Sequence, residues 1–142
     1  MINTLARDLY PWIRARIAIP LPFSPSAGVT SPYTANGNIY TAPVGWECTP
    51  MAFYAGVYVA TTNSALNYWT ITLYIVYAGG AATSQGSVNT AALSANQWQS
   101  LSLSTFTTSP WIPTSNAAVA YLNITKTGAP GNLYLAPALY VI

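Results

Sequence analysis

Residues 68–77 read Tyr-Trp-Thr-Ile-Thr-Leu-Tyr-Ile-Val-Tyr, and this stretch decides the fold class. One set of alternate positions carries large apolar side chains, namely Trp69, Ile71, Leu73, Ile75 and Tyr77. The positions between them hold Tyr68, Thr70, Thr72, Tyr74 and Val76. Because successive side chains of a β-strand point to opposite faces, this alternation predicts a strand with one buried face and one face of tyrosine and threonine.

The same alternation recurs along the chain, between short clusters of turn-forming residues. Two further runs have a predicted core side: Phe53, Ala55, Val57 and Val59 in the first, and Leu133, Leu135, Pro137, Leu139 and Val141 in the second. Strands are also expected at residues 98–106 and 117–126, with shorter ones at 39–44 and 87–90. About seven short strands with turns between them predict an all-β fold, an antiparallel β-sandwich of jelly-roll type.

The first 38 residues differ in composition from the strand region. Apolar residues recur at three- and four-residue steps between Ile2 and Ile13, which predicts a short amphipathic helix that Pro11 kinks or ends. Residues 17–38 are rich in proline and predict an extended arm. The chain is therefore divided into a helix and arm at residues 1–38 and a sandwich domain at 39–142.

The predicted helix either caps the domain or anchors the chain to a partner, and the sequence leaves both interpretations open. Three arginines and Asp8 give the first 16 residues the whole formal charge of +2, and because prolines and charge set residues 1–38 apart from the strand region, we expect this segment to attach the protein rather than to hold its fold. The residues expected to form an anchor are Leu5, Arg7, Leu9, Trp12, Arg14 and Arg16.

The residue types that catalysis and metal binding require are scarce. The chain has no histidine, one cysteine (Cys48), and two acidic residues, Asp8 and Glu47, that lie in different segments. A carboxylate pair and a metal site with three or four ligands are therefore not expected, and Lys126 is interpreted as a solvated charge at a strand end. We expect no enzyme activity, no metal and no other cofactor.

Two classes of partner are also not expected. Neutralising nucleic-acid phosphates requires a basic patch, and four Lys and Arg residues supply little of one. The longest apolar runs are too short or too interrupted to span a membrane.

Tyrosines occupy the side of the predicted strands that faces away from the aliphatic residues. They are Tyr54, Tyr58, Tyr68, Tyr74, Tyr134 and Tyr140. Tyrosine is enriched at protein interfaces, and only 4% of the residues are charged, so these six are expected to form a contact face for self-association. The alternatives are a solvated sheet, a reversed parity in which tyrosine is the core side, or a sugar platform. A sugar platform would use Trp98 or Trp111, with the amides of Asn96, Gln97 and Asn116.

Two runs of sequence resemble a known group of proteins. Residues 89–98 (Asn-Thr-Ala-Ala-Leu-Ser-Ala-Asn-Gln-Trp) and 122–142, which begin Leu-Asn-Ile-Thr-Lys-Thr-Gly-Ala-Pro-Gly-Asn, are similar to jelly-roll modules of tailed-bacteriophage virion proteins. These modules include capsid decoration (cement) proteins and tail-fibre or tail-tip modules, and the likeness covers roughly residues 45–142.

The resemblance implies a structural protein located in the virion. Its expected partners are the major capsid protein or another virion protein, together with further copies of itself. A trimer is the expected oligomer, because trimers suit the threefold axes of a shell. The alternative is a receptor-binding module of a tail fibre or tail tip, which would bind cell-surface carbohydrate.

Overall fold

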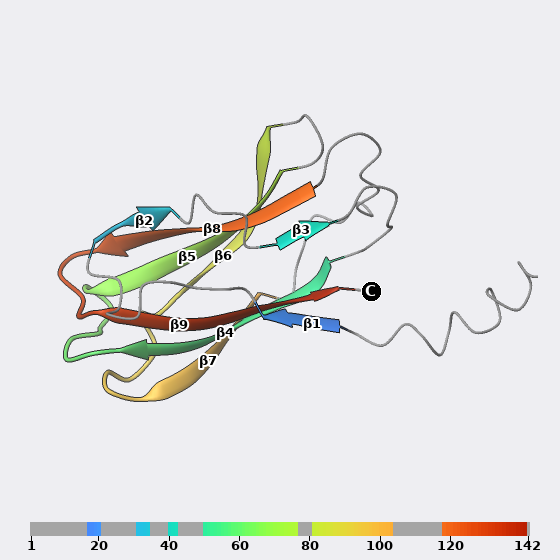
Figure 1. The fold of residues 1–142 in the computed structure, drawn as a ribbon. Coiled ribbons are helices and arrows are strands. Elements are labelled where there is room, and N and C mark those ends of the chain that lie inside the picture. Colours follow the sequence, from blue (N-terminus) through green and yellow to red (C-terminus); the bar gives the residue numbers. More distant parts are fainter. Residues whose placement is uncertain are drawn as a thin grey trace, which may run out of the picture.

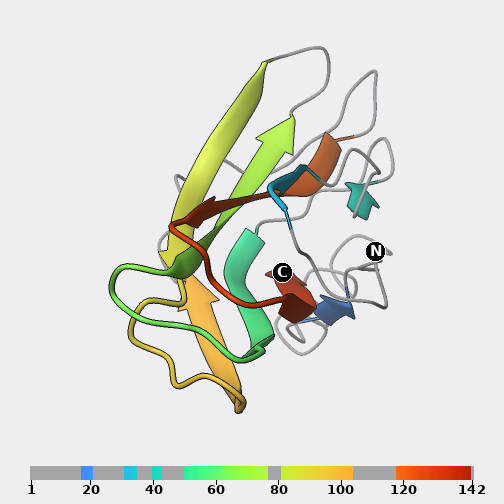
Figure 2. The same ribbon diagram turned by 90° about the vertical axis from the view of Figure 1, so that its left-hand side faces the viewer.

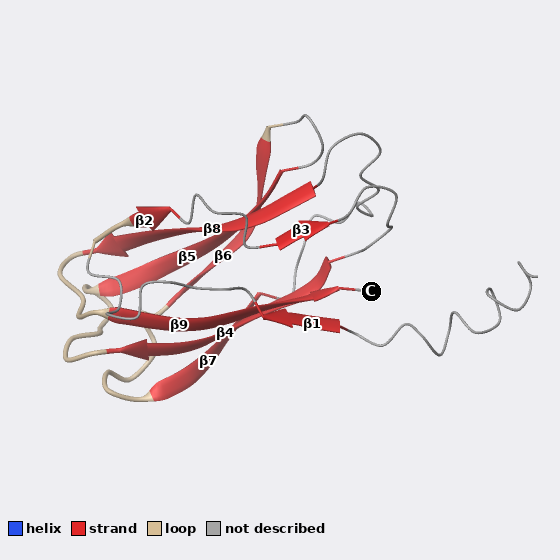
Figure 3. Ribbon diagram, in the orientation of Figure 1, coloured by secondary structure: helices blue, strands red, loops and turns tan. Residues whose placement is uncertain are grey.

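The computed structural model describes residues 17–20, 31–34, 40–42, 50–76, 81–103 and 118–141. Within these ranges all the secondary-structure elements are β-strands (Figure 1 and Figure 3). The strands are β1 (Ile17–Pro20), β2 (Tyr33–Thr34), β3 (Tyr40–Ala42), β4 (Pro50–Val59), β5 (Tyr68–Val76), β6 (Ala82–Asn89), β7 (Trp98–Leu103), β8 (Ala118–Thr127) and β9 (Leu133–Val141).

The strands form two antiparallel sheets that face each other (Figure 1). Sheet A has the order β1-β9-β4-β7, and sheet B has the order β2-β8-β5-β6, with β3 also paired to β8. Every strand pairing in the two sheets is antiparallel. The predicted all-β class with antiparallel sheets is thus confirmed for the described residues.

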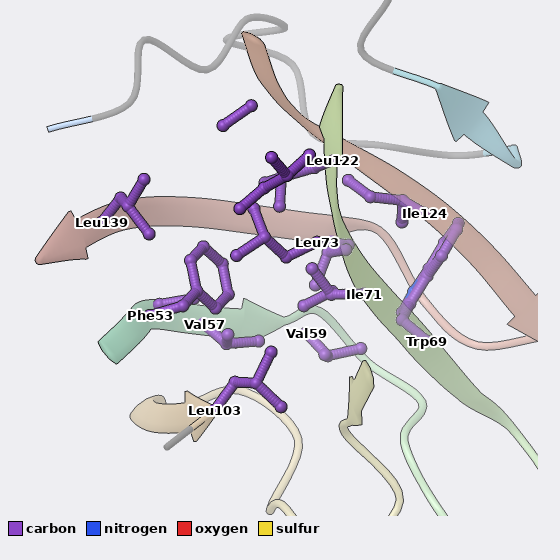
Figure 4. Packing of buried hydrophobic residues seen from close by; sticks show 14 residues of the cluster. Phe53, Val57, Val59, Trp69, Ile71, Leu73, Leu103, Leu122, Ile124 and Leu139 are labelled. Atoms are coloured by element: carbon purple, nitrogen blue, oxygen red, sulfur yellow. The ribbon is translucent and has the colours of Figure 1, made fainter. Parts of the chain in front are cut away.

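The core lies between the sheets and is built from the predicted alternation. In β5 the odd-numbered residues from Trp69 to Ile75 are fully buried, while the residues between them are partly exposed. In β4 the odd-numbered residues from Phe53 to Val59 are buried in the same cluster, which Figure 4 shows from close by. Burying an aliphatic or phenylalanine side chain contributes about 1.5–3 kcal/mol, so this layer is the main stabilising element of the fold.

The loops before β5 and before β7 lie at one end of the sandwich and are tied to each other; Figure 2 views the molecule from that end. The Asn63 amide donates to the carbonyl oxygens of Thr90 (2.5 Å) and Leu93 (2.6 Å), and the Thr90 hydroxyl donates back to Asn63 Oδ1 (2.7 Å). The Thr61 N–H donates to Asn96 Oδ1 (2.9 Å). These bonds join the loops before β5 and before β7, and they fix where β7 begins.

The structure adds strands that the sequence patterns did not predict. β1 and β2 lie within the predicted arm and pair with β9 and β8, so part of residues 17–38 belongs to the sheet edges. β6 begins at Ala82 rather than near residue 87, because its first four residues, Ala-Thr-Ser-Gln, do not alternate between apolar and polar. The predicted helix between Ile2 and Ile13 lies outside the described residues.

Candidate functional site

The outer face of sheet A carries a row of three aromatic side chains. Tyr58 of β4 is in register with Trp98 of β7 on one side and with Tyr134 of β9 on the other. The ring centroids of Tyr58 and Trp98 are 5.7 Å apart, and those of Tyr58 and Tyr134 are also 5.7 Å apart in an edge-to-face arrangement. Such pairs contribute about 0.5–1.5 kcal/mol beyond their buried area, so the three rings hold one another in place.

Small residues separate this row from a fourth aromatic side chain, Tyr54. The next row of the sheet is Ser100, Gly56 and Ala136, and the row after it places Ser102 and Ala138 on either side of Tyr54. A Cβ added to Gly56 would lie 3.9 Å from Cε3 of Trp98, so the indole leans over the glycine. We call this surface the aromatic face. It comprises Tyr54, Gly56, Tyr58, Trp98, Ser100, Ser102, Tyr134, Ala136 and Ala138.

The aromatic face is both accessible and uncharged. Trp98 is 62% exposed and Tyr54 is 42% exposed. Lys126 is the one formally charged residue among those that the structure describes, and it is not on this face. Its ammonium lies 6.0 Å from the ring centroid of the core residue Trp69, at the end of β8. The chemistry that this face offers is therefore ring stacking, apolar contact and hydroxyl hydrogen bonding.

The structure divides the tyrosines of the predicted contact face between two opposite surfaces. Tyr54, Tyr58 and Tyr134 lie on the outer face of sheet A, whereas Tyr68 and Tyr74 lie on the outer face of sheet B. The prediction that these tyrosines form one surface is therefore wrong. The physical reason is that alternation assigns each residue a side of its own strand, but not the sheet to which that strand belongs.

The outer face of sheet B has a different character. Tyr74 stacks on Tyr121 of β8 with ring centroids 5.2 Å apart and planes inclined by 8°. Around this pair the face carries hydroxyl and amide side chains, and the hydroxyls of Thr72 and Ser87 are 2.7 Å apart. Among the residues that the structure describes, this face has one stacked aromatic pair within a mainly polar surface, whereas the outer face of sheet A has a row of three contacting aromatic rings.

Two aromatic residues of these faces were not among the predicted interface residues. The sequence patterns place Trp98 only in the sugar-platform alternative and assign no role to Tyr121. The alternation in residues 98–103 could have placed Trp98 on the outer face. Trp98 lies on the same side of the strand as Ser100 and Ser102, opposite Leu101 and Leu103.

The other predicted site residues are only partly described. The Asn96 side chain accepts a hydrogen bond from the Thr61 backbone, so its amide oxygen has a structural role, while Gln97 is exposed. Outside the described residues lie Glu47, Cys48, Trp111, Asn116 and the anchor residues Leu5, Arg7, Leu9, Trp12, Arg14 and Arg16. The side chain of Tyr140 is likewise not described, although its backbone pairs with β1 and β4.

The described ranges contain neither a metal-binding cluster nor a membrane-spanning helix. No group of three or more His, Cys, Asp or Glu residues gathers there, and no helix there has the length and apolar character to cross a bilayer.

No protein-family model, curated protein or solved structure matches the chain.

Proposed function

We propose that the chain is a non-enzymatic structural protein, a jelly-roll domain that attaches to a virion shell by protein–protein contact. The observation that carries this proposal is the aromatic face of sheet A, which presents four aromatic side chains and no formal charge. The resemblance of residues 89–98 and 122–142 to virion modules supplies the setting, a capsid decoration protein bound to the major capsid protein.

The strand order supports the jelly-roll assignment. If β2 and β3, which both pair with β8, count as one position, the described strands occupy eight positions in chain order. Sheet A then holds the first, eighth, third and sixth, and sheet B holds the second, seventh, fourth and fifth. This is the order of a jelly roll, an architecture common in viral capsid proteins and in lectins. Because the same fold occurs in capsid proteins and in lectins, the choice between these functions has to be argued from the residues of the site.

The absence of charge on the aromatic face favours an uncharged protein surface as its partner. Tyr and Trp are enriched at interface centres, where charged residues are depleted. Burying a few hundred Å² of this face at about 25 cal/mol per Å² would contribute several kcal/mol before the costs of association. An anionic partner would find no complementary charge on either Tyr54 or Trp98, the two most exposed rings of the face.

We expect Tyr54→Lys combined with Tyr134→Lys to abolish attachment to the shell. Each change would place an ammonium in a contact from which water is excluded, and an unpaired charge buried in this way costs several kcal/mol. Binding should therefore weaken by about 100-fold or more. The measurement is co-sedimentation with empty shells assembled from the major capsid protein encoded in the same genome.

The matched control is Thr72→Lys combined with Tyr74→Lys, which adds the same charge to the outer face of sheet B. This control should co-sediment like the parent chain, and both variants should keep the parent circular dichroism spectrum. The proposal fails if the parent does not bind the shells, or if the two double variants lose binding equally.

One observation favours a second candidate, a receptor-binding module that stacks sugar rings on Trp98. This indole is the most exposed aromatic ring of the aromatic face. It contacts Tyr58, and it belongs to the first residue of β7, next to the hydrogen-bonded loop. Two amides near it, however, already have structural bonds: Asn96 accepts from Thr61, and the Gln99 amide donates to the Ser94 carbonyl oxygen at 2.8 Å. Fewer polar groups are then available to orient sugar hydroxyls, which makes protein contact the better-supported function.

A glycan array separates the two candidates. Carbohydrate binding that Trp98→Ala abolishes, with no binding to shells, would establish the receptor-binding function. The decoration function predicts shell binding and no glycan signal above that of Trp98→Ala.

A further inference from the structure

The four edge positions of the two sheets differ in how they are protected against pairing with another chain. An edge strand exposes unpaired backbone N–H and C=O groups, and proteins usually block them with short strands, proline, charge or a bulge. β1 is four residues long and ends at Pro20, which has no N–H. β2 and β3, on the β8 side of sheet B, have only two and three residues.

The edge strand β6 is protected by a bulge. Its register with β5 shifts between Leu73 and Tyr74, opposite Gly86, which has a φ of +133°. A side chain would be strained at this position, because L-residues rarely adopt such a φ and because a Cβ on Gly86 would lie 2.8 Å from Cδ1 of Leu103. A bulge bends an edge strand and interrupts the ladder that a second chain would need.

The edge strand β7 carries none of these devices. Its six residues, Trp-Gln-Ser-Leu-Ser-Leu, contain no charge and no proline. They pair with residues 53–58 of β4 without a register shift. Within the described residues, β4 is the one strand that pairs with β7. An uncharged, unbroken edge of this length is a template for strand addition.

Hydrogen bonds at the end of β4 identify which backbone groups of β7 point outward. The Ala60 N–H donates to the carbonyl of Asn132, toward β9, whereas the Val59 carbonyl accepts from the N–H of Asn96, toward β7. In an antiparallel ladder these directions alternate from residue to residue. The odd-numbered residues of β4 therefore bond to Gln99, Leu101 and Leu103. The outward-pointing residues of β7 are Trp98, Ser100 and Ser102.

We propose that β7 pairs with β7 of a second copy, antiparallel about a two-fold axis at Ser100. This register pairs Ser100 with Ser100 and Trp98 with Ser102 of the second copy, so all three outward-pointing residues bond and about six backbone hydrogen bonds form. The largest side chain of the strand stands opposite a small one, and no like charges meet. The two copies of sheet A become one continuous sheet.

The dimer also brings the two aromatic faces together. Ser102 is in register with Tyr54, so the row that contains Trp98 of one copy continues to Tyr54 of the other.

The pairing does not depend on what the aromatic face binds. A two-fold axis gives a dimer, whereas the expected trimer rests on shell symmetry and not on a feature of this chain.

Two charged variants at the axis test the proposal. Ser100→Lys brings two ammonium groups opposite each other across the axis, and Ser100→Glu brings two carboxylates together. Like charges directly opposite each other in a sheet destabilise the pairing. By sedimentation velocity we expect a dimer for the parent and a monomer for each variant alone. An equimolar mixture of the two variants should form a heterodimer, because Lys then faces Glu.

A control and a backbone variant make the result specific to β7. Ser84→Lys adds the same charge to β6, the other long edge strand, and should remain dimeric. Ser100→Pro removes an outward-pointing N–H without touching the β4 ladder, and it should be monomeric with the parent circular dichroism spectrum. The proposal is overturned by a monomeric or trimeric parent, by Ser100 variants that stay dimeric, or by a Lys–Glu mixture that stays monomeric.

Discussion

Gly131→Ala is expected to destabilise the fold by about 3 kcal/mol or more, which is a large part of the 5–15 kcal/mol that stabilises a typical domain. A Cβ at this position would overlap the carbonyl oxygen of Ala60, which is backbone and cannot rotate away. The loop cannot retreat either, because the Gly131 N–H donates to the carbonyl of Thr62 (2.7 Å) and its own carbonyl accepts from the Trp69 indole (2.7 Å). Equilibrium urea unfolding measures the loss as a lower midpoint.

The matched control is Gly56→Ala, in the middle of β4. Its Cβ would meet Ala136 Cβ at 3.5 Å, which is ordinary van der Waals contact, and alanine is better suited to a strand than glycine. Gly56→Ala should therefore unfold at the parent midpoint or slightly above it. Equal midpoints for Gly131→Ala and the parent would mean that the loop before β9 adjusts at no cost, contrary to the geometry described above.

The faces of the central strands could be predicted from sequence because their residues alternate strictly. In β5, Trp69, Ile71, Leu73 and Ile75 are all fully buried as predicted, and β4 repeats the pattern. In β9, Leu133, Pro137 and Leu139 are buried, again on the predicted side. A half-buried strand shows this alternation because every second side chain points into the core, where apolar residues are favoured whatever the neighbouring strands are.

The edge strands could not be predicted, because they depend on pairing partners that are distant in the chain. β1 is placed by pairing with residues 138–141, and neither its length nor its proline identifies it as a strand. The first three residues of β6 are exposed and the fourth, Gln85, is buried but polar, so no apolar alternation marks this half of the strand. Edge strands have fewer neighbours, and local sequence constrains them less.

The aromatic face was predicted only in part for the same reason. The outward parity of Tyr54, Tyr58 and Tyr134 follows from alternation, but their grouping with Trp98 depends on the order β9-β4-β7. The separation of Tyr74 from this group depends on the assignment of β5 to the opposite sheet. Strand order is long-range information, so a site built across three strands emerges only once the sheets are known.

Trp69→Ala is expected to lower stability by about 3–5 kcal/mol, because Trp69 is the largest fully buried side chain of the core. The loss has two sources. Truncation leaves a cavity between the sheets, and it removes the indole N–H that the Gly131 carbonyl accepts at 2.7 Å. For a chain of this size the thermal midpoint should fall by about 10–20 °C, which differential scanning calorimetry measures directly.

Trp69→Phe separates the two sources, because it retains an aromatic ring in the core and removes only the N–H and part of the ring volume. The Gly131 carbonyl is partly buried, so the loss of its donor costs at most the roughly 1–3 kcal/mol of a buried unsatisfied group, and this variant should fall between the parent and Trp69→Ala. Trp98→Phe is the control, since Trp98 is 62% exposed and its replacement should leave the midpoint within a few degrees of the parent. If Trp69→Ala and Trp98→Phe unfolded at the same temperature, the loop end of the sandwich would not depend on the Trp69–Gly131 bond, and the packing inferred for that end would be wrong.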